Sequence, residues 1–134
     1  MATKEIDSTI RQDADLWEID FGRWEGMSFP EIAATDPELV DEWARGDMDF
    51  CFPKGESIEI FRERVERAAD RMRNCQEDIL IVVAHGGVIR FLICYFLGLP
   101  PQSYLMFEVN PGSITRIRLH DGHGALAGLN DFDF

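Results

Sequence analysis

The chain contains one unbroken run of branched apolar residues, Ile79–Ala84, which leads directly into a His-Gly-Gly turn at residues 85–87. A continuous apolar run is typical of a strand that is buried on both faces, as in a parallel sheet. The helical pattern of Val88–Leu97 follows at once, and Gly98 can end that helix. The sequence therefore predicts a strand, a tight turn and a helix as one unit of a layered α/β fold.

Local signals along the rest of the chain predict the other elements. Pro30–Thr35 and Pro37–Arg45 each begin with proline, which is tolerated in the first turn of a helix. Ser57–Asn74 is a longer helix, with Ser57 as N-cap and apolar residues at three-to-four spacing. Further strands are predicted over Leu16–Phe21, Tyr104–Val109 and Ser113–Leu119.

The turn at His85 has the features of a phosphate site. Ligands of open α/β sheets bind beyond the carboxyl ends of the strands, where His85 is predicted to lie. Gly86 and Gly87 allow the backbone to approach a ligand, and the free N–H groups of the next helix favour an anion. Arg90 either adds positive charge to this pocket or lies on the helix surface. The alternative for His85 is a histidine that only makes hydrogen bonds within a tight turn.

A second stretch, LWEIDFGRWEG at residues 16–26, contains the carboxylate Glu18 on a predicted strand beside two tryptophans. A carboxyl group against apolar walls can have a raised pKa and act as a proton donor. The alternative is a surface carboxylate on an edge strand. His120 and His123 are predicted to be turn residues, and no third ligand for a metal is apparent near them.

Four motifs together resemble the histidine phosphatase superfamily, whose members have a phosphoglycerate mutase-like fold. LWEIDFGRWEG is similar to the family's L-x-E-x-x-x-G-x-W-E-G, and AHGGVIR at residues 84–90 is similar to S-H-G-G-x-I-R. PKGES at residues 53–57 resembles P-G-G-E-S, with Lys54 in place of a glycine, and Asn110–Thr115 resembles N-x-S-I-T. The motifs occur in the family's order and are most similar to α-ribazole phosphatase-type and broad-specificity phosphatase members.

The resemblance implies a three-layer α/β fold with a mostly parallel sheet, and hydrolysis of small phosphomonoesters through a phosphohistidine. Neither a metal nor an organic cofactor is implied. Glu18 matches the family's general acid, and His85 matches the second histidine, which contacts the transferred phosphoryl group. Gly86 matches a position whose backbone N–H can reach that phosphate.

The family's nucleophile lies in an Arg-His-Gly motif after its first strand, and no Arg-His pair occurs in these 134 residues. The family's second phosphate-binding arginine has no counterpart either. We therefore expect a single, N-terminally truncated domain over residues 1–134 that lacks the family's first strands and is inactive alone. Residues 1–15 would then form a replacement strand or a disordered arm. The alternative is a non-catalytic phosphate-binding or protein-interaction remnant that self-associates.

The resemblance also predicts a partner, because the family's first strand lies beside the strand that corresponds to Ile79–Ala84. An uncovered edge there would invite pairing with another chain, either in a homo-oligomer or with a complementing N-terminal fragment. The net charge of −12 disfavours nucleic acid and anionic lipid as partners. No apolar run approaches the roughly 20 residues that span a bilayer, and the start lacks a signal-peptide pattern, so we expect a cytoplasmic protein.

Overall fold

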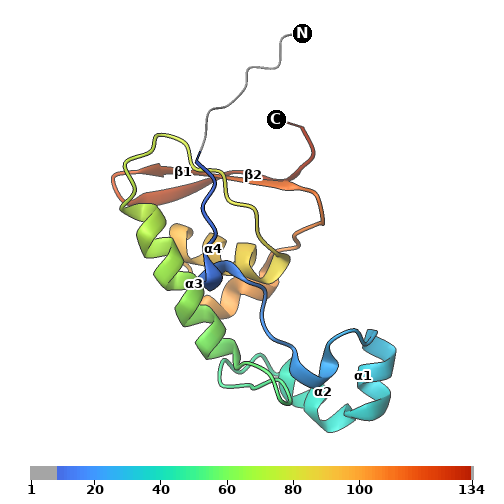
Figure 1. Cartoon of the computed structure of the whole chain (residues 1–134). Helices are drawn as coiled ribbons and strands as arrows, with labels where there is room; N and C mark the ends of the chain where they lie inside the picture. The colour runs from blue at the N-terminus through green and yellow to red at the C-terminus, as the bar shows by residue number, and fades with distance from the viewer. Residues whose placement is uncertain (1–8, 134) are drawn as a thin grey trace.

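The computed structural model describes residues 9–133, a set of helices with a β-hairpin at one end (Figure 1). The α-helices are α1 (Phe29–Thr35), α2 (Pro37–Ala44), α3 (Ile58–Arg73) and α4 (Gly86–Leu97). Of three short 3-10 helices, η1 (Ala14–Leu16) and η2 (Gly22–Trp24) precede α1, and η3 (Pro101–Met106) follows α4. The hairpin consists of β1 (Ile114–His120) and β2 (His123–Asp131). No helix in this described part is long and apolar enough to cross a membrane.

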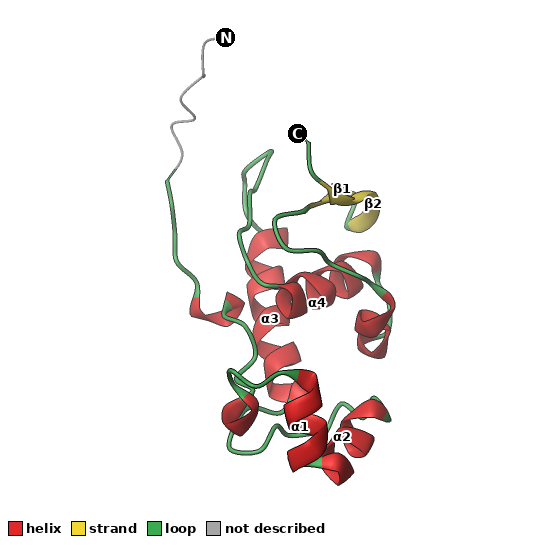
Figure 2. Cartoon of the chain, turned by 90° about the vertical axis from the view of Figure 1, so that its right-hand side faces the viewer, coloured by secondary structure: helices red, strands yellow, loops and turns green. Residues whose placement is uncertain are grey.

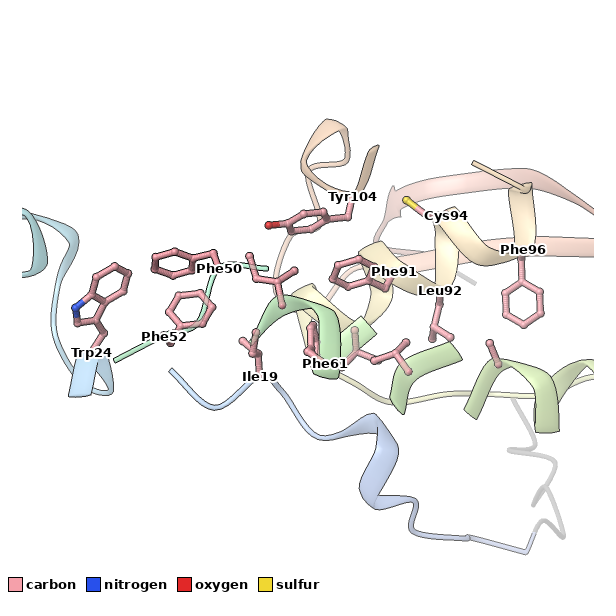
Figure 3. Packing of buried hydrophobic residues seen from close by; sticks show 14 residues of the cluster. Ile19, Trp24, Phe50, Phe52, Phe61, Phe91, Leu92, Cys94, Phe96 and Tyr104 are labelled. Atoms are coloured by element: carbon pink, nitrogen blue, oxygen red, sulfur yellow. The ribbon is translucent and has the colours of Figure 1, made fainter. Parts of the chain in front are cut away.

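Helices α3 and α4 pack against each other and form the centre of the molecule. Helix α3 begins at Ser57, whose hydroxyl accepts a hydrogen bond from the N–H of Ile60 at 3.1 Å, as the sequence predicts. Phe61 of α3 meets Phe91 of α4 edge to face at 5.5 Å, and Phe91 stacks on Tyr104 of η3 at 4.5 Å (Figure 3). Such aromatic pairs stabilise a core by about 0.5–1.5 kcal/mol beyond the area that they bury.

Helices α1 and α2 lie at the end of the molecule opposite the hairpin (Figure 2). They cover a second group of buried aromatic side chains around Trp24, which includes Phe50 and Phe52. The indole Nε1 of Trp24 donates a hydrogen bond of 2.8 Å to Asp36, the residue between α1 and α2. Asp36 also accepts a hydrogen bond of 2.8 Å from Nη2 of Arg23, so two polar contacts join the segment after Glu18 to this helical pair.

The predicted strand over Ile79–Ala84 is wrong for the described residues, where this segment is an extended loop. No backbone hydrogen bond joins it to another part of residues 9–133. Val82 and Ala84 pack against the core, but Ile79 and Val83 are 82% and 93% exposed. A strand requires a neighbour to bond with, and residues 9–133 provide none here. The mostly parallel sheet is therefore replaced in this part of the chain by the antiparallel hairpin alone.

Two other strand predictions also differ from the structure. The segment Leu16–Phe21 begins in η1 and continues without regular structure, although its Ile19 is buried. The segment Tyr104–Val109 begins within η3. Of the predicted replacement strand or arm over residues 1–15, residues 1–8 lie outside the described part, and residues 9–15 form no strand.

The C-terminal hairpin confirms the predicted strand over Ser113–Leu119, which corresponds to β1, and adds β2 as its antiparallel partner. The turn between the strands is Asp121-Gly122, with φ angles of 48° and 78°. Positive φ at both central residues is the signature of the tight hairpin turn that an Asp-Gly pair favours. His120 and His123 face each other as the residues that flank this turn.

Candidate functional site

The start of α4 is built around His85, the N-cap residue of the helix. The His85 side chain is exposed, and its carbonyl accepts a hydrogen bond of 3.0 Å from the N–H of Ile89. Gly86 is the first residue of α4, and the N–H groups of a first turn have no acceptor within their own helix. The first turn contains no acidic residue. The positive end of the helix dipole therefore lies beside an exposed imidazole, as an anion site requires.

Glu18 lies at this helix start, although 69 positions of sequence separate it from Gly87. Its Oε2 atom accepts a hydrogen bond of 3.2 Å from the N–H of Gly87, and its Oε1 atom accepts one of 3.0 Å from the N–H of Ile19. A Cβ atom on Gly87 would lie 2.5 Å from Oε1 of Glu18. Glycine at position 87 thus makes room for this carboxylate, and the two sequence motifs meet at one point.

Backbone contacts with the PKGES segment support the chain that follows Glu18. The N–H of Arg23 donates to the carbonyl of Pro53 at 2.8 Å, and the N–H of Glu56 donates to the carbonyl of Asp20 at 2.9 Å. Side chains on Gly22 or Gly55 would overlap the main chain of the opposite segment. Both glycines are therefore needed for two backbones to lie in direct contact.

The fourth motif also reaches the site. The side-chain oxygen of Asn130 accepts hydrogen bonds from the N–H of Asn110 at 2.8 Å and from the hydroxyl of Ser113 at 3.2 Å. The chain that leads into this turn passes α4, because the carbonyl of Val109 is 4.0 Å from the position of a Cβ on Gly86. The motif holds that turn closed beside the helix start.

The structure places Arg90 on α4 against the chain that follows η3. Its side chain is half-buried, and its Nε donates a hydrogen bond of 2.8 Å to the carbonyl of Phe107. This contact ties α4 to the chain after η3. A role for Arg90 in binding phosphate stays a prediction, as do the roles of Glu18, His85 and Gly86.

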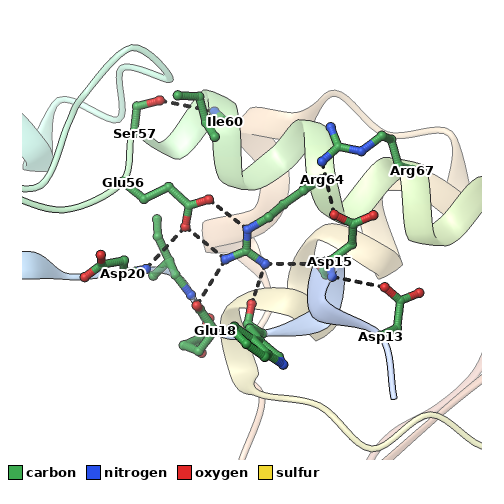
Figure 4. Close-up of polar contacts among 11 residues, drawn as sticks. Asp13, Asp15, Glu18, Asp20, Glu56, Ser57, Ile60, Arg64 and Arg67 are labelled. Atoms are coloured by element: carbon green, nitrogen blue, oxygen red, sulfur yellow. Dashed lines mark hydrogen bonds and ion pairs between the residues drawn. The ribbon is translucent and has the colours of Figure 1, made fainter. Parts of the chain in front are cut away.

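The main chain of the Glu18 segment is held by Arg64, which no sequence pattern indicated, and by Glu56 of the PKGES motif (Figure 4). Arg64 lies on α3, and its guanidinium contacts backbone carbonyls nearly 50 positions earlier in the sequence. Every residue has a backbone carbonyl, so the residue types do not indicate which carbonyls accept hydrogen bonds. Only the position of Glu56 within the PKGES motif pointed to this contact.

The described residues contain no group of three histidine, cysteine or acidic side chains that could hold a metal ion. The two histidines of the hairpin turn are exposed and both contact Asp121. His120 approaches its carboxylate at 3.4 Å, and His123 lies 3.0 Å from its carbonyl oxygen.

Comparisons with known proteins agree with the arrangement of motifs. A model of the histidine phosphatase superfamily (branch 1) matches residues 1–132. The adenosylcobalamin/alpha-ribazole phosphatase of Escherichia coli is 30% identical over 118 residues, which are 87% of this chain and 58% of that protein. A bifunctional protein of Mycobacterium tuberculosis is 35% identical over 108 residues, which are 81% of this chain and 26% of that protein.

The fold is also similar to solved structures. The crystal structure of the alpha-ribazole phosphatase from Shigella flexneri superposes with a TM-score of 0.80 at 27% identity, over 96% of this chain and 64% of that chain. The expected α/β fold of the phosphoglycerate mutase-like kind is thereby confirmed. The chain spans little more than half the length of the E. coli relative, and about a quarter of the mycobacterial one.

Proposed function

The chain belongs to the histidine phosphatase superfamily (branch 1), and we propose on this basis that it carries the proton donor and part of the phosphate site of a phosphomonoesterase. The observation that supports this most directly is the hydrogen bond between Glu18 and the N–H of Gly87. It brings a carboxyl group to the helix start that follows His85. A proton donor and an anion site are the two parts that cleavage of a phosphate ester needs side by side.

In the proposed reaction, the phosphoryl group of a small phosphomonoester binds at the start of α4. The imidazole of His85 and the N–H of Gly86 contact its oxygens, and Arg90 adds positive charge from the same helix. A nucleophilic histidine attacks phosphorus, so a nitrogen–phosphorus bond forms while the bond to the leaving oxygen breaks. Glu18 gives its proton to that oxygen. Water then attacks phosphorus of the phosphohistidine, so an oxygen–phosphorus bond forms while the nitrogen–phosphorus bond breaks and inorganic phosphate leaves. Glu18 takes up the proton that water releases.

The nucleophile of this proposal comes from a segment outside the 134 residues, because none of the three histidines follows an arginine. We propose that this segment pairs with residues 79–84, in the same polypeptide or in another. The alternation along the loop fits such pairing: Val82 packs inward while Ile81 and Val83 remain exposed. Side chains that alternate between two faces are the pattern of a strand.

The test measures hydrolysis of p-nitrophenyl phosphate by the chain alone and mixed with a separately made N-terminal fragment that carries the family's Arg-His-Gly motif. We expect little or no activity of the chain alone and measurable activity of the mixture. Glu18→Gln and His85→Ala should each lower the activity of the mixture at least tenfold. His120→Ala, which changes an exposed turn residue, is the control and should leave the rate unchanged. Activity of the mixture that survives His85→Ala would contradict the proposed site.

A second candidate, from another class, is a non-catalytic phosphate-binding or interaction module that self-associates. The exposed apolar side chains of residues 79–83 favour it. This candidate predicts an inactive mixture together with binding of inorganic phosphate that His85→Ala abolishes. Titration calorimetry with phosphate, run beside the hydrolysis assay, separates the two functions.

A further inference from the structure

The guanidinium of Arg64 binds the main chain immediately around Glu18 (Figure 4). Its Nη1 donates to the carbonyls of Trp17 at 2.6 Å and Asp15 at 3.0 Å, and its Nη2 donates to the carbonyl of Glu18 at 3.1 Å. The segment that carries Glu18 belongs to no strand, so it lacks the ladder of hydrogen bonds that would otherwise fix it. One side chain on α3 supplies these bonds instead.

The carboxylate of Glu56 holds Arg64 from the other side. Its two oxygens accept from Nε of Arg64 at 2.7 Å and from Nη2 at 2.9 Å, a forked pairing that fixes the plane of the guanidinium. The same carboxylate accepts from the N–H of Asp20 at 3.3 Å. The main chain is therefore held on both sides of Glu18, by Arg64 before it and by Glu56 after it.

The hydrogen-bond partners of Arg64 distinguish this pair from the other ion pairs of the helix. The side chains of Arg64 and Glu56 are only 13% and 15% exposed, and three of the five hydrogen bonds of the guanidinium go to backbone carbonyls. Arg62, on the same helix, pairs instead with Glu59 and Glu66 of α3 itself. Arg62 therefore offers a matched control of the same residue type.

We infer that Arg64, clamped by Glu56, is a positioning residue that holds the proton donor Glu18 against the start of α4. The inference rests on the proposed role of Glu18, and it adds the residues that fix the position of this carboxyl group. Ile19 remains anchored in the core without Arg64, because its side chain is buried. Removal of the guanidinium should therefore loosen the backbone at Trp17 and Glu18 while the fold persists.

The first test uses the chain alone and nuclear magnetic resonance. Since Glu18 accepts from the N–H of Gly87, ionisation of Glu18 should shift the amide resonance of Gly87 as the pH is raised. Glu18→Gln should abolish this shift and thereby assign it. Arg64→Met should reduce it to less than half, whereas Arg62→Met should leave it unchanged. Arg64→Lys keeps a charge but loses the fork, and should give an intermediate shift. A full shift in folded Arg64→Met would overturn the inference.

The second test uses the mixture that carries the nucleophile and compares two esters. A proton donor matters most for a poor leaving group, so Arg64→Met should slow phenyl phosphate hydrolysis about tenfold more than 2,4-dinitrophenyl phosphate hydrolysis. Equal slowing of both esters would show a general structural effect and contradict the inference. If the mixture is inactive but Arg64→Met still removes the Gly87 shift, the positioning role stands and the proposed hydrolysis fails.

Discussion

At position 87, a carboxylate occupies the space where a side chain would lie. The nearest atom to a Cβ on Gly87 is Oε1 of Glu18, at 2.5 Å, and this atom is the end of a flexible side chain. We predict that Gly87→Ala keeps the fold, because Glu18 can turn away, and that it slows phenyl phosphate hydrolysis by the complemented enzyme at least tenfold. Urea unfolding and the rate with this ester check the two halves of the prediction.

Gly86→Ala is the matched control for that change. It adds the same methyl group one residue earlier, where the nearest atom is the carbonyl of Val109 at 4.0 Å. Alanine has a higher helix propensity than glycine, and both variants gain it. A difference between their hydrolysis rates therefore reports on Glu18. The preference for esters with good leaving groups should increase in Gly87→Ala only. An equal increase in both variants would mean that Glu18 does not depend on the space at Gly87.

Lys54 adopts a backbone conformation that explains why the family motif has glycine there. Its φ angle is 61°, in the left-handed region that costs a residue with a Cβ about 1–2 kcal/mol. We predict that Lys54→Gly raises the free energy of unfolding by about 0.5–1 kcal/mol, the strain released less the greater flexibility of glycine when unfolded. Lys54→Ala keeps the strain and should give no gain. Urea unfolding of the three proteins measures the difference.

The sequence indicated Glu18 and His85 as candidate site residues because each lies in a motif with glycines at fixed offsets. It did not indicate Arg64, whose partners are carbonyl groups that every residue possesses. Nor did it indicate that Gly87 and Glu18 touch, because 69 positions separate them. Contacts of this kind depend on the packing of α3 against the Glu18 segment, which no local pattern records.

Among the elements, the helices were predictable because their signals are local. Ser57 caps α3 with its own hydroxyl, and Gly98 ends α4 with a φ of 67°. The strand over Ile79–Ala84 was not predictable in the same way, because a strand exists only beside another strand. β2 did carry a signal, the Asp121-Gly122 pair that favours a two-residue hairpin turn, which the prediction of a simple turn at His120 and His123 did not use.

The junction between α1 and α2 depends on the charge of Asp36. The hydrogen bond from Trp24 lowers the pKa of Asp36 below its usual value, against the opposing effect of burial, and Arg23 lowers it further at 2.8 Å. A carboxyl group whose pKa is lowered in the folded state adds stability above its unfolded pKa, about 3.9. That stability is lost as the pH falls through the lower, folded value.

We therefore predict that Asp36→Asn is less stable than the wild type at pH 7 and that the difference shrinks below about pH 4. Urea midpoints followed by tryptophan fluorescence at pH 7, 4 and 3 measure it, because Trp24 reports on this contact directly. Asp41→Asn, an exposed position on α2, is the matched control and should show no such dependence. A difference that stays constant from pH 7 to pH 3 would contradict a charged contact.

For the molecule as a whole, the apolar loop 79–84 is the feature that the described residues leave uncovered. It lies in a chain with a net charge of −12, where like charges oppose association unless apolar contacts outweigh them. Full burial of a valine, leucine or isoleucine side chain contributes about 1.5–3 kcal/mol, and several such side chains are exposed here. The α/β fold class could be predicted from the sequence. Whether residues 79–84 form a strand depends on whether another strand lies beside them.

We predict that the chain self-associates at micromolar concentration through residues 79–84, and that Val83→Lys makes it monomeric. Val83 is 93% exposed, so lysine there should not disturb the packing within one chain, while its charge opposes strand pairing. Met106→Lys changes an equally open apolar side chain on η3, 80% exposed, and should not affect association. Sedimentation equilibrium over a range of concentrations decides. A wild-type monomer that unfolds cooperatively would show that the loop is stable without a partner, and loss of association in Met106→Lys alone would move the contact to η3.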